Sequence, residues 1–200
     1  MNNRRSLLLS TTLAAVLCLP CALAGAAPTV STVGGDTRVV LSETFLGALD
    51  QLGVAASPSF PAKLRRGEAR FPIPTGEIDL ASARGEIVHG GGLNLQAGGL
   101  TVNLSSFVID TTGDSPVLTG LVKANDSVIA RLELFNLQLT VAPDVTQSGR
   151  VGRLHIQDVA VTLSAEAAAA LNDVFNVTAF QAGLPIGTAR VNSYFFEPDH

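Results

Sequence analysis

The clearest pattern in the chain is an alternation of apolar and polar positions. In residues 100–105, leucine and valine alternate with threonine, asparagine and serine. A strand with one buried and one solvated face produces this period of two. Phe107 and Ile109 continue the apolar series one residue out of phase. Since a one-residue slip turns side chains to the other face, the pattern predicts a β-bulge near Ser105-Ser106.

The same behaviour recurs in residues 128–141, where the apolar phase changes near Phe135-Asn136 and predicts a second bulge or bend. Short strands separated by glycine, proline or serine are expected elsewhere in the chain. Their predicted ranges are 37–41, 69–73, 76–80, 85–89, 159–163 and 186–191.

Two short segments carry helical spacing instead. Ser42 has the character of an N-cap, the apolar residues that follow it recur three and four apart, and Gly53 ends the pattern. Ser164 in turn caps a predicted helix over 165–175, whose alanine run suits close packing against a sheet. The chain therefore predicts one helix near each end of the mature sequence.

These elements indicate a mainly β fold: an antiparallel β-sandwich or open barrel with two short helices. No linker or repeat divides residues 27–200, which are expected to form one domain. Three segments are expected to lack regular structure. They are a flexible lead-in over 28–36, a polar loop over 142–150 and a loose tail over 192–200.

Residues 1–26 have the composition of a secretory signal peptide. Two arginines precede an apolar core over 7–19, and A-x-A cleavage sites end at Ala24 and Ala26. Both cysteines, Cys18 and Cys21, lie inside this segment. The mature chain is therefore expected to be secreted, periplasmic or on the cell surface, without disulfides. It has no further apolar stretch long enough to span a membrane.

The charge of the chain limits its partners. Seventeen acidic residues outweigh thirteen basic ones, for a formal net charge of −4, which argues against nucleic acid. The densest basic cluster, residues 63–66, predicts a solvated loop rather than an anion site.

The order of elements resembles the HtaA-type domain of secreted and surface haem-handling proteins in Gram-positive bacteria. Three stretches carry the resemblance: LSETF at 41–45, GEIVHGGGLNL at 85–95 with the strand over 100–110, and VTLSAEAAAALN at 161–172 followed by Phe180, Gly183 and Gly187. Together they cover most of the mature chain.

The resemblance implies a haem site built from an axial tyrosine in the first helix and a supporting histidine. His89 matches that histidine by context, whereas the tyrosine window, residues 46–49, reads LGAL and contains no tyrosine. The alternative interpretation of His89 is a turn histidine bonded to the backbone. Tyr194, the single tyrosine, is a substitute candidate ligand with Phe195 beside it. The alternative there is an aromatic patch that packs the tail onto the sheet.

The sequence gives little support for a hydrolase site, a zinc site or a glycosidase site. His89-Gly90-Gly91-Gly92 matches an oxyanion loop of α/β hydrolases, but the chain has no G-x-S-x-G elbow. Three scattered histidines and no mature cysteine exclude structural zinc. His155 is expected on the wet face of a strand. A glycosidase pair drawn from Glu68, Glu77, Asp79 and Glu86 is conceivable, although no pattern favours it.

Two functions remain from the sequence. The first is an exported, non-catalytic binding or surface module of HtaA-like fold, whose ligand is haem or another flat apolar molecule. The alternative is a structural or interaction protein of the cell envelope, with a protein partner and no small ligand. An enzyme is not expected.

Overall fold

The computed structural model describes residues 29–125 and 127–196. The expected signal peptide and both cysteines therefore lie outside the described residues. Two helices, α1 (Glu43–Gln51) and α2 (Ala165–Phe175), accompany the strands. The strands are β1 (Thr29–Leu41), β2 (Ala55–Ser59), β3 (Lys63–Arg65), β4 (Glu68–Pro72), β5 (Thr75–Asp79), β6 (Gly85–Val88), β7 (Gly92–Ala97), β8 (Leu100–Asp110), β9 (Val117–Ala124), β10 (Ser127–Leu139), β11 (Asp144–Ser148), β12 (Val151–Leu163) and β13 (Pro185–Phe196).

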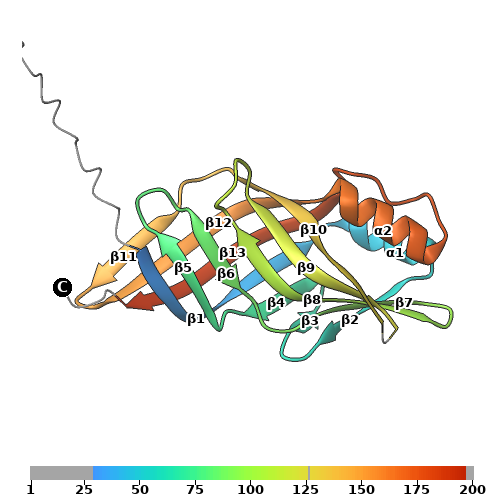
Figure 1. Cartoon of the computed structure of the whole chain (residues 1–200), viewed down its shortest axis with the longest axis horizontal. Helices are drawn as coiled ribbons and strands as arrows, with labels where there is room; N and C mark the ends of the chain where they lie inside the picture. Colours follow the sequence, from blue (N-terminus) through green and yellow to red (C-terminus); the bar gives the residue numbers. More distant parts are fainter. Residues whose placement is uncertain (1–28, 126, 197–200) are drawn as a thin grey trace, which may run out of the picture.

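Eight of these strands close an antiparallel barrel (Figure 1). The order around the wall is β12-β10-β9-β8-β6-β5-β1, and β13 closes it by pairing with both β1 and β12. Of the two architectures left open by the sequence, the barrel is therefore the one observed. Alternate side chains of each strand face the interior, where a continuous apolar core fills the space.

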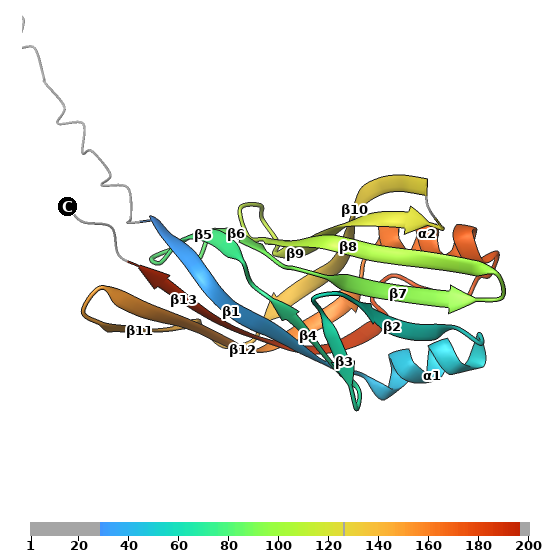
Figure 2. The ribbon, with the colours of Figure 1, turned by 90° about the horizontal axis from the view of Figure 1, so that it is seen from below.

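The barrel wall divides in two along its length (Figure 2). On one edge β1 pairs first with β5, through residues 29–32, and then with β4, through residues 36–40. Likewise β8 pairs with β6 through residues 108–110 and with β7 through residues 100–105. Beyond the division, the wall continues on one side as β4 and β3, next to β1, and on the other side as β7 and β2, next to β8. Among the described strands, β3 and β2 do not pair with each other.

A bulge marks each strand at the point where its partner changes. On β8 the register shifts between Ser105 and Val108, and Ser106 has φ +53°, which confirms the predicted bulge. On β1 the register with β13 shifts between Thr32 and Gly35. The other predicted bulge, near Phe135, is confirmed by a register shift between Glu133 and Phe135.

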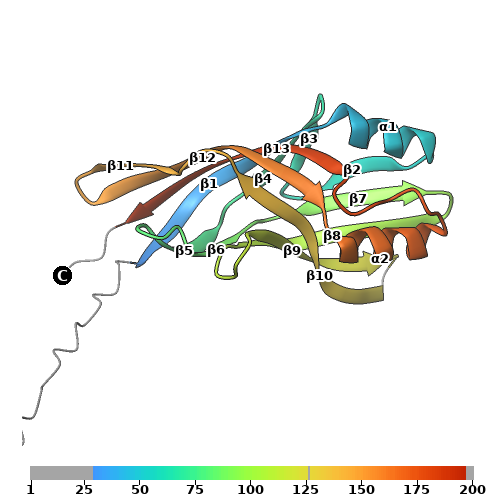
Figure 3. The same ribbon diagram turned by 90° about the horizontal axis from the view of Figure 1, so that it is seen from above.

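The two helices lie at the same end of the barrel, on opposite sides of it (Figure 3). The Ser42 hydroxyl accepts a hydrogen bond from the Phe45 amide at 3.0 Å, and the Ser164 hydroxyl accepts one from the Ala167 amide at 2.9 Å. Both predicted N-caps are thus confirmed. Phe45 and Leu49 of α1 and Leu171 of α2 enter the core, so the helices cover that end of the barrel.

Two segments expected to be irregular are strands. The predicted lead-in over 28–36 is wrong because β1 begins at Thr29, and Gly34-Gly35 is a bulge within that strand rather than a linker. The loop predicted over 142–150 contains β11, which pairs with β12. All five β11 residues are exposed, so this strand has no apolar alternation that a sequence pattern could reveal. The basic cluster over 63–66 likewise contains strand β3.

The expectation of a loose tail from Asn192 is also wrong as far as Phe196, because β13 continues to that residue between β1 and β12. Phe195 is 1% exposed, and its ring covers Gly152 so closely that a Cβ there would lie 2.0 Å from Cζ. The absence of a side chain at Gly152 of β12 therefore leaves room for the Phe195 ring, which packs the end of β13 against β12.

Replacing Phe195 with alanine should lower the free energy of unfolding by about 3–5 kcal/mol, because it leaves a cavity in the core. Urea unfolding checks this value. Phe196 is the matched control: it is 53% exposed, and Phe196→Ala should change the stability by about 0.5 kcal/mol or less. Equal effects of the two substitutions would contradict the observed strand.

Candidate functional site: a buried histidine at the division of the barrel wall

His89 lies where the barrel wall divides, between the end of β6 and the start of β7. Its amide donates to the Phe107 carbonyl at 2.9 Å, and the Gly90 amide donates to the Pro72 carbonyl at 2.8 Å. At Gly91, with φ +87°, a Cβ would lie 2.4 Å from the Ala62 nitrogen. Only glycine fits such a close approach, so this turn holds the β2–β3 connection against the barrel.

The His89 side chain points into the interior and is 3% exposed. Its Nε2 is hydrogen bonded to the Thr37 hydroxyl of β1 at 2.7 Å. Nδ1 is buried and makes no hydrogen bond within the described part of the chain. Since a buried polar atom without a partner is uncommon and costly, this nitrogen is the feature that most needs a functional explanation.

Burial lowers the pKa of His89 to about 4. The nearby backbone carbonyls of Ile87 and Phe107 oppose this shift but do not outweigh it. The imidazole is therefore neutral near pH 7. A neutral imidazole can offer a nitrogen lone pair to a metal or accept a hydrogen bond.

The interior beside His89 contains a cavity of only about 60 Å³. Apart from Thr37 and His89, its walls are apolar, and Phe71 and Phe107 meet there edge to face with ring centroids 5.3 Å apart. Typical ligand pockets measure about 300–1,000 Å³. The folded interior therefore has room for a few water-sized molecules and not for a macrocycle.

Of the three residues predicted to form a site, the structure does not bring Tyr194 to His89. Tyr194 is 43% exposed on the outside of β13, where the Arg153 guanidinium lies 5.3 Å from the centre of its ring. Phe195 faces the opposite way, into the core against Gly152. Because neighbouring strand residues point to opposite faces, Tyr194 and Phe195 cannot flank one ligand.

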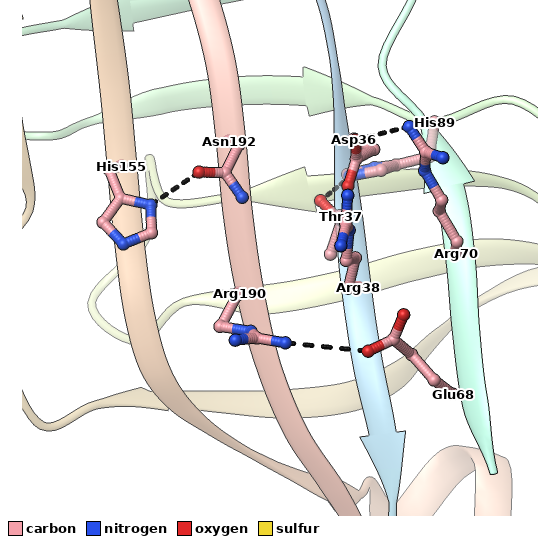
Figure 4. A network of polar contacts seen from close by, with 9 residues as sticks. All are labelled: Asp36, Thr37, Arg38, Glu68, Arg70, His89, His155, Arg190 and Asn192. Carbon is pink, nitrogen blue, oxygen red and sulfur yellow. Dashed lines mark hydrogen bonds and ion pairs between the residues drawn. The ribbon is translucent and has the colours of Figure 1, made fainter. Parts of the chain in front are cut away.

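The outer face of the wall carries a polar network instead (Figure 4). His155 is part of it: its Nδ1 and the Asn192 side-chain oxygen are 2.7 Å apart across β12 and β13. Asp36 receives hydrogen bonds from Arg38 at 2.7 Å and from Arg70 at 2.8 Å. Burial raises the pKa of Asp36, but the two guanidinium groups outweigh this effect and hold the pKa below its usual value. Sequence reasoning missed this network because its members are far apart in the chain.

The carboxylates named as a conceivable catalytic pair separate in the structure. Glu77 and Glu86 are register partners on β5 and β6, but both are exposed to solvent. Glu68 lies 3.6 Å from Arg190, and Asp79 accepts bonds from the Ser82 and Ala81 amides that hold its pKa below the usual value. Nothing buries one carboxyl of the exposed pair so that it could serve as the acid.

No protein-family model matches the chain, and no curated protein matches it. Several solved structures match it. The C-terminal domain of HtaA from Corynebacterium glutamicum matches with a TM-score of 0.63 and 14% identity, over 83% of this chain and 99% of that one. Haem-binding protein HtaB from the same organism matches with a TM-score of 0.55 and 14% identity, over 84% of this chain and 95% of that one. The chain has an HtaA-type fold.

A third solved structure also matches. It is a histidine-to-alanine variant of the HtaA domain, described as a domain-swapped dimer, with a TM-score of 0.52 and 15% identity, over 75% of this chain and 87% of that one. At these identities the likeness establishes the HtaA-type fold, while the chemistry of the site depends on the residues present here.

Those residues fit haem in one respect only. His89 offers a buried, neutral imidazole, but the cavity beside it is too small, and the α1 window at residues 46–49 has no tyrosine. The described residues contain no group of three potential metal ligands, and none of the helices in the described ranges is long and apolar enough to cross a membrane.

Lowering the pH should destabilise the protein through His89. Its pKa is depressed in the folded state, so below pH 6.5 the unfolded chain binds a proton that the folded chain rejects. This contribution to stability is complete above pH 6.5 and falls by about 3 kcal/mol as the pH approaches 4.

Urea unfolding across this pH range should show the loss in the native chain and a shallower dependence in His89→Gln. The slope is compared with that of His155→Gln, which removes an imidazole from the outer face and leaves His89 in place. An NMR titration of the His89 ring with a midpoint near pH 6.5 would contradict the assignment.

Proposed function

We propose that this chain is an exported, non-catalytic binding module of the cell envelope that acts through its outer surface. One observation carries the proposal: the HtaA-type barrel is filled. The cavity at His89 measures about 60 Å³, and four phenylalanine rings, Phe45, Phe71, Phe107 and Phe135, line it. With the interior occupied by the chain's own side chains, the outer face is where a partner binds. Export rests on the signal peptide predicted over residues 1–26.

The polar groups of the interior also favour a surface role. Thr37 already occupies Nε2 of His89, and the pair is buried among apolar side chains. A hydrogen bond inside an apolar core fixes the side chains that make it, because breaking it leaves a buried group unpaired. In this proposal His89 positions β1 against the turn that follows β6, and its role is structural.

A second candidate is a site for haem or another flat apolar ligand. The observation that favours it is the buried Nδ1 of His89, which has no hydrogen-bond partner among residues 29–125 and 127–196 and belongs to a neutral imidazole. A ligand could reach this nitrogen only if the wall opened. The seam between β2 and β3 offers a route, because no strand pairing between these two described strands has to break there.

A haemin titration of residues 27–200 separates the two candidates. We expect no saturable Soret shift at micromolar haemin, since the folded interior has no space for a porphyrin. A saturable shift that His89→Ala abolishes and Tyr194→Phe leaves intact would overturn the first candidate and support the second. A shift lost in Tyr194→Phe alone would place the ligand on the outer face.

Export can be tested separately. The protein expressed from its full sequence in a bacterial host should be recovered outside the cytoplasm. Mass spectrometry should show that it begins at Gly25 or Ala27, after one of the two A-x-A sites. A full-length chain retained in the cytoplasm would contradict the proposal.

A further inference from the structure

Four basic side chains form a single row across the outer face of four adjacent strands. Arg190 of β13 is the register partner of Arg38 of β1, and Arg38 is that of Arg70 of β4. Arg70 in turn faces Lys63 of β3. Directly opposed residues share one face of a sheet, and adjacent strands lie about 4.8 Å apart, so the four side chains stand side by side. Figure 4 shows the three arginines on their neighbouring strands.

We call Lys63, Arg38, Arg70 and Arg190 the basic row. It opposes the charge of the whole chain, whose formal net charge is −4. Among the described residues, two carboxylates contact the row: Asp36 bonds Arg38 and Arg70, and Glu68 lies 3.6 Å from Arg190. Arg65, the register partner of Glu68, adds a further cation on the same side of β3. The face therefore keeps a positive excess.

This arrangement does not help the sheet to fold. Like charges directly opposite each other destabilise paired strands. Asp36 reduces that repulsion through one nitrogen of each guanidinium, and its side chain is largely buried beside them. The side chains of Arg38, Arg70 and Arg190 remain nearly half exposed. The guanidinium groups are thus held in position at the surface, where an anion can reach them.

Three exposed apolar side chains lie on or close to the strands that carry the row. Phe60, on the turn between β2 and β3, is 93% exposed and lies three residues before Lys63, which places the two α-carbons within about 11 Å. Val40 follows Arg38 on the same face of β1 and is half exposed. Leu46 of α1, also exposed, lies near the turn at Gly67 between β3 and β4, where a Cβ on the glycine would be 3.8 Å from Leu46 Cδ1.

A row of cations beside an exposed aromatic ring fits the interface of an anionic membrane. Arginine and lysine bind lipid phosphates there, while apolar side chains enter the boundary with the acyl chains. A soluble polyanion would use the cations but would leave Phe60 without a role. We propose that the basic row, with Phe60, docks the protein on an anionic lipid surface. This inference rests on the proposed surface role and names its partner.

Vesicle binding tests the inference directly. Purified residues 27–200 are sedimented with vesicles of phosphatidylcholine alone or mixed with phosphatidylglycerol, at low and high salt. We expect binding only to the mixed vesicles, and weaker binding at high salt because screening reduces the attraction. Each basic side chain near such a surface contributes about fivefold, so Lys63→Gln with Arg190→Gln should weaken binding about 25-fold.

The matched controls carry equal changes elsewhere on the barrel. Lys123→Gln with Arg131→Gln removes two cations from β9 and β10, and Val128→Ser removes an exposed apolar side chain from the hairpin between them. Both should bind as the unaltered chain does, while Phe60→Ser should bind severalfold more weakly. Thermal unfolding establishes that every variant is folded.

Three outcomes would overturn the inference: no binding to mixed vesicles, equal losses in the control and row variants, or binding to heparin that Phe60→Ser leaves unchanged while vesicles fail. The last result would make the partner a soluble polyanion. Because purified protein is used, none of these results depends on export. Failure of the lipid docking is thereby distinguished from failure of the proposed envelope role.

Discussion

The structure depends on one constraint. Along one of its edges, β1 must pair first with β5 and then with β4, and β8 must pair with both β7 and β6, without breaking the barrel. A strand can do this only where its backbone leaves the regular pleat. On β1 the change falls at Gly34 and Gly35, with φ of +91° and +121°, and on β8 it falls at Ser106. At Gly35 a Cβ would lie 2.0 Å from the Asn192 carbonyl oxygen, so the close approach of β13 requires glycine.

The position of His89 follows from that division. The chain crosses from β6 to β7, which lie on the two sides of the division. At this crossing the His89 and Gly90 amides donate hydrogen bonds to the Phe107 and Pro72 carbonyls. Once its backbone is fixed there, the imidazole has no path to solvent and bonds Thr37. The low pKa and the unpaired Nδ1 both result from this placement. A histidine can thus persist in this fold for a packing reason, independently of any ligand.

Sequence patterns predict the parts of this fold in which burial alternates along the chain. The bulge at Ser105-Ser106 and the caps Ser42 and Ser164 were predictable because each leaves a local signal of phase or capping chemistry. Strand β11 leaves none, since all of its residues are exposed. For the site, His89 was found from its context. Its partner Thr37 lies 52 residues away in the chain, a distance that no local pattern spans. The opposite directions of Tyr194 and Phe195 follow from the alternation of a strand, but the sequence predicts a loose tail there and not β13.

The inner and outer faces of β1 show how one strand can serve two purposes. Thr37 faces inward and bonds His89, while its neighbours Asp36 and Arg38 face outward. There Asp36 forms ion pairs with both Arg38 and Arg70. Because successive residues of a strand point to opposite faces, the outer face can change without disturbing the core. An HtaA-type barrel with a packed interior can therefore bind a partner through its outer surface alone. In this chain the basic row is the part of that surface whose arrangement opposes folding and therefore points to a function.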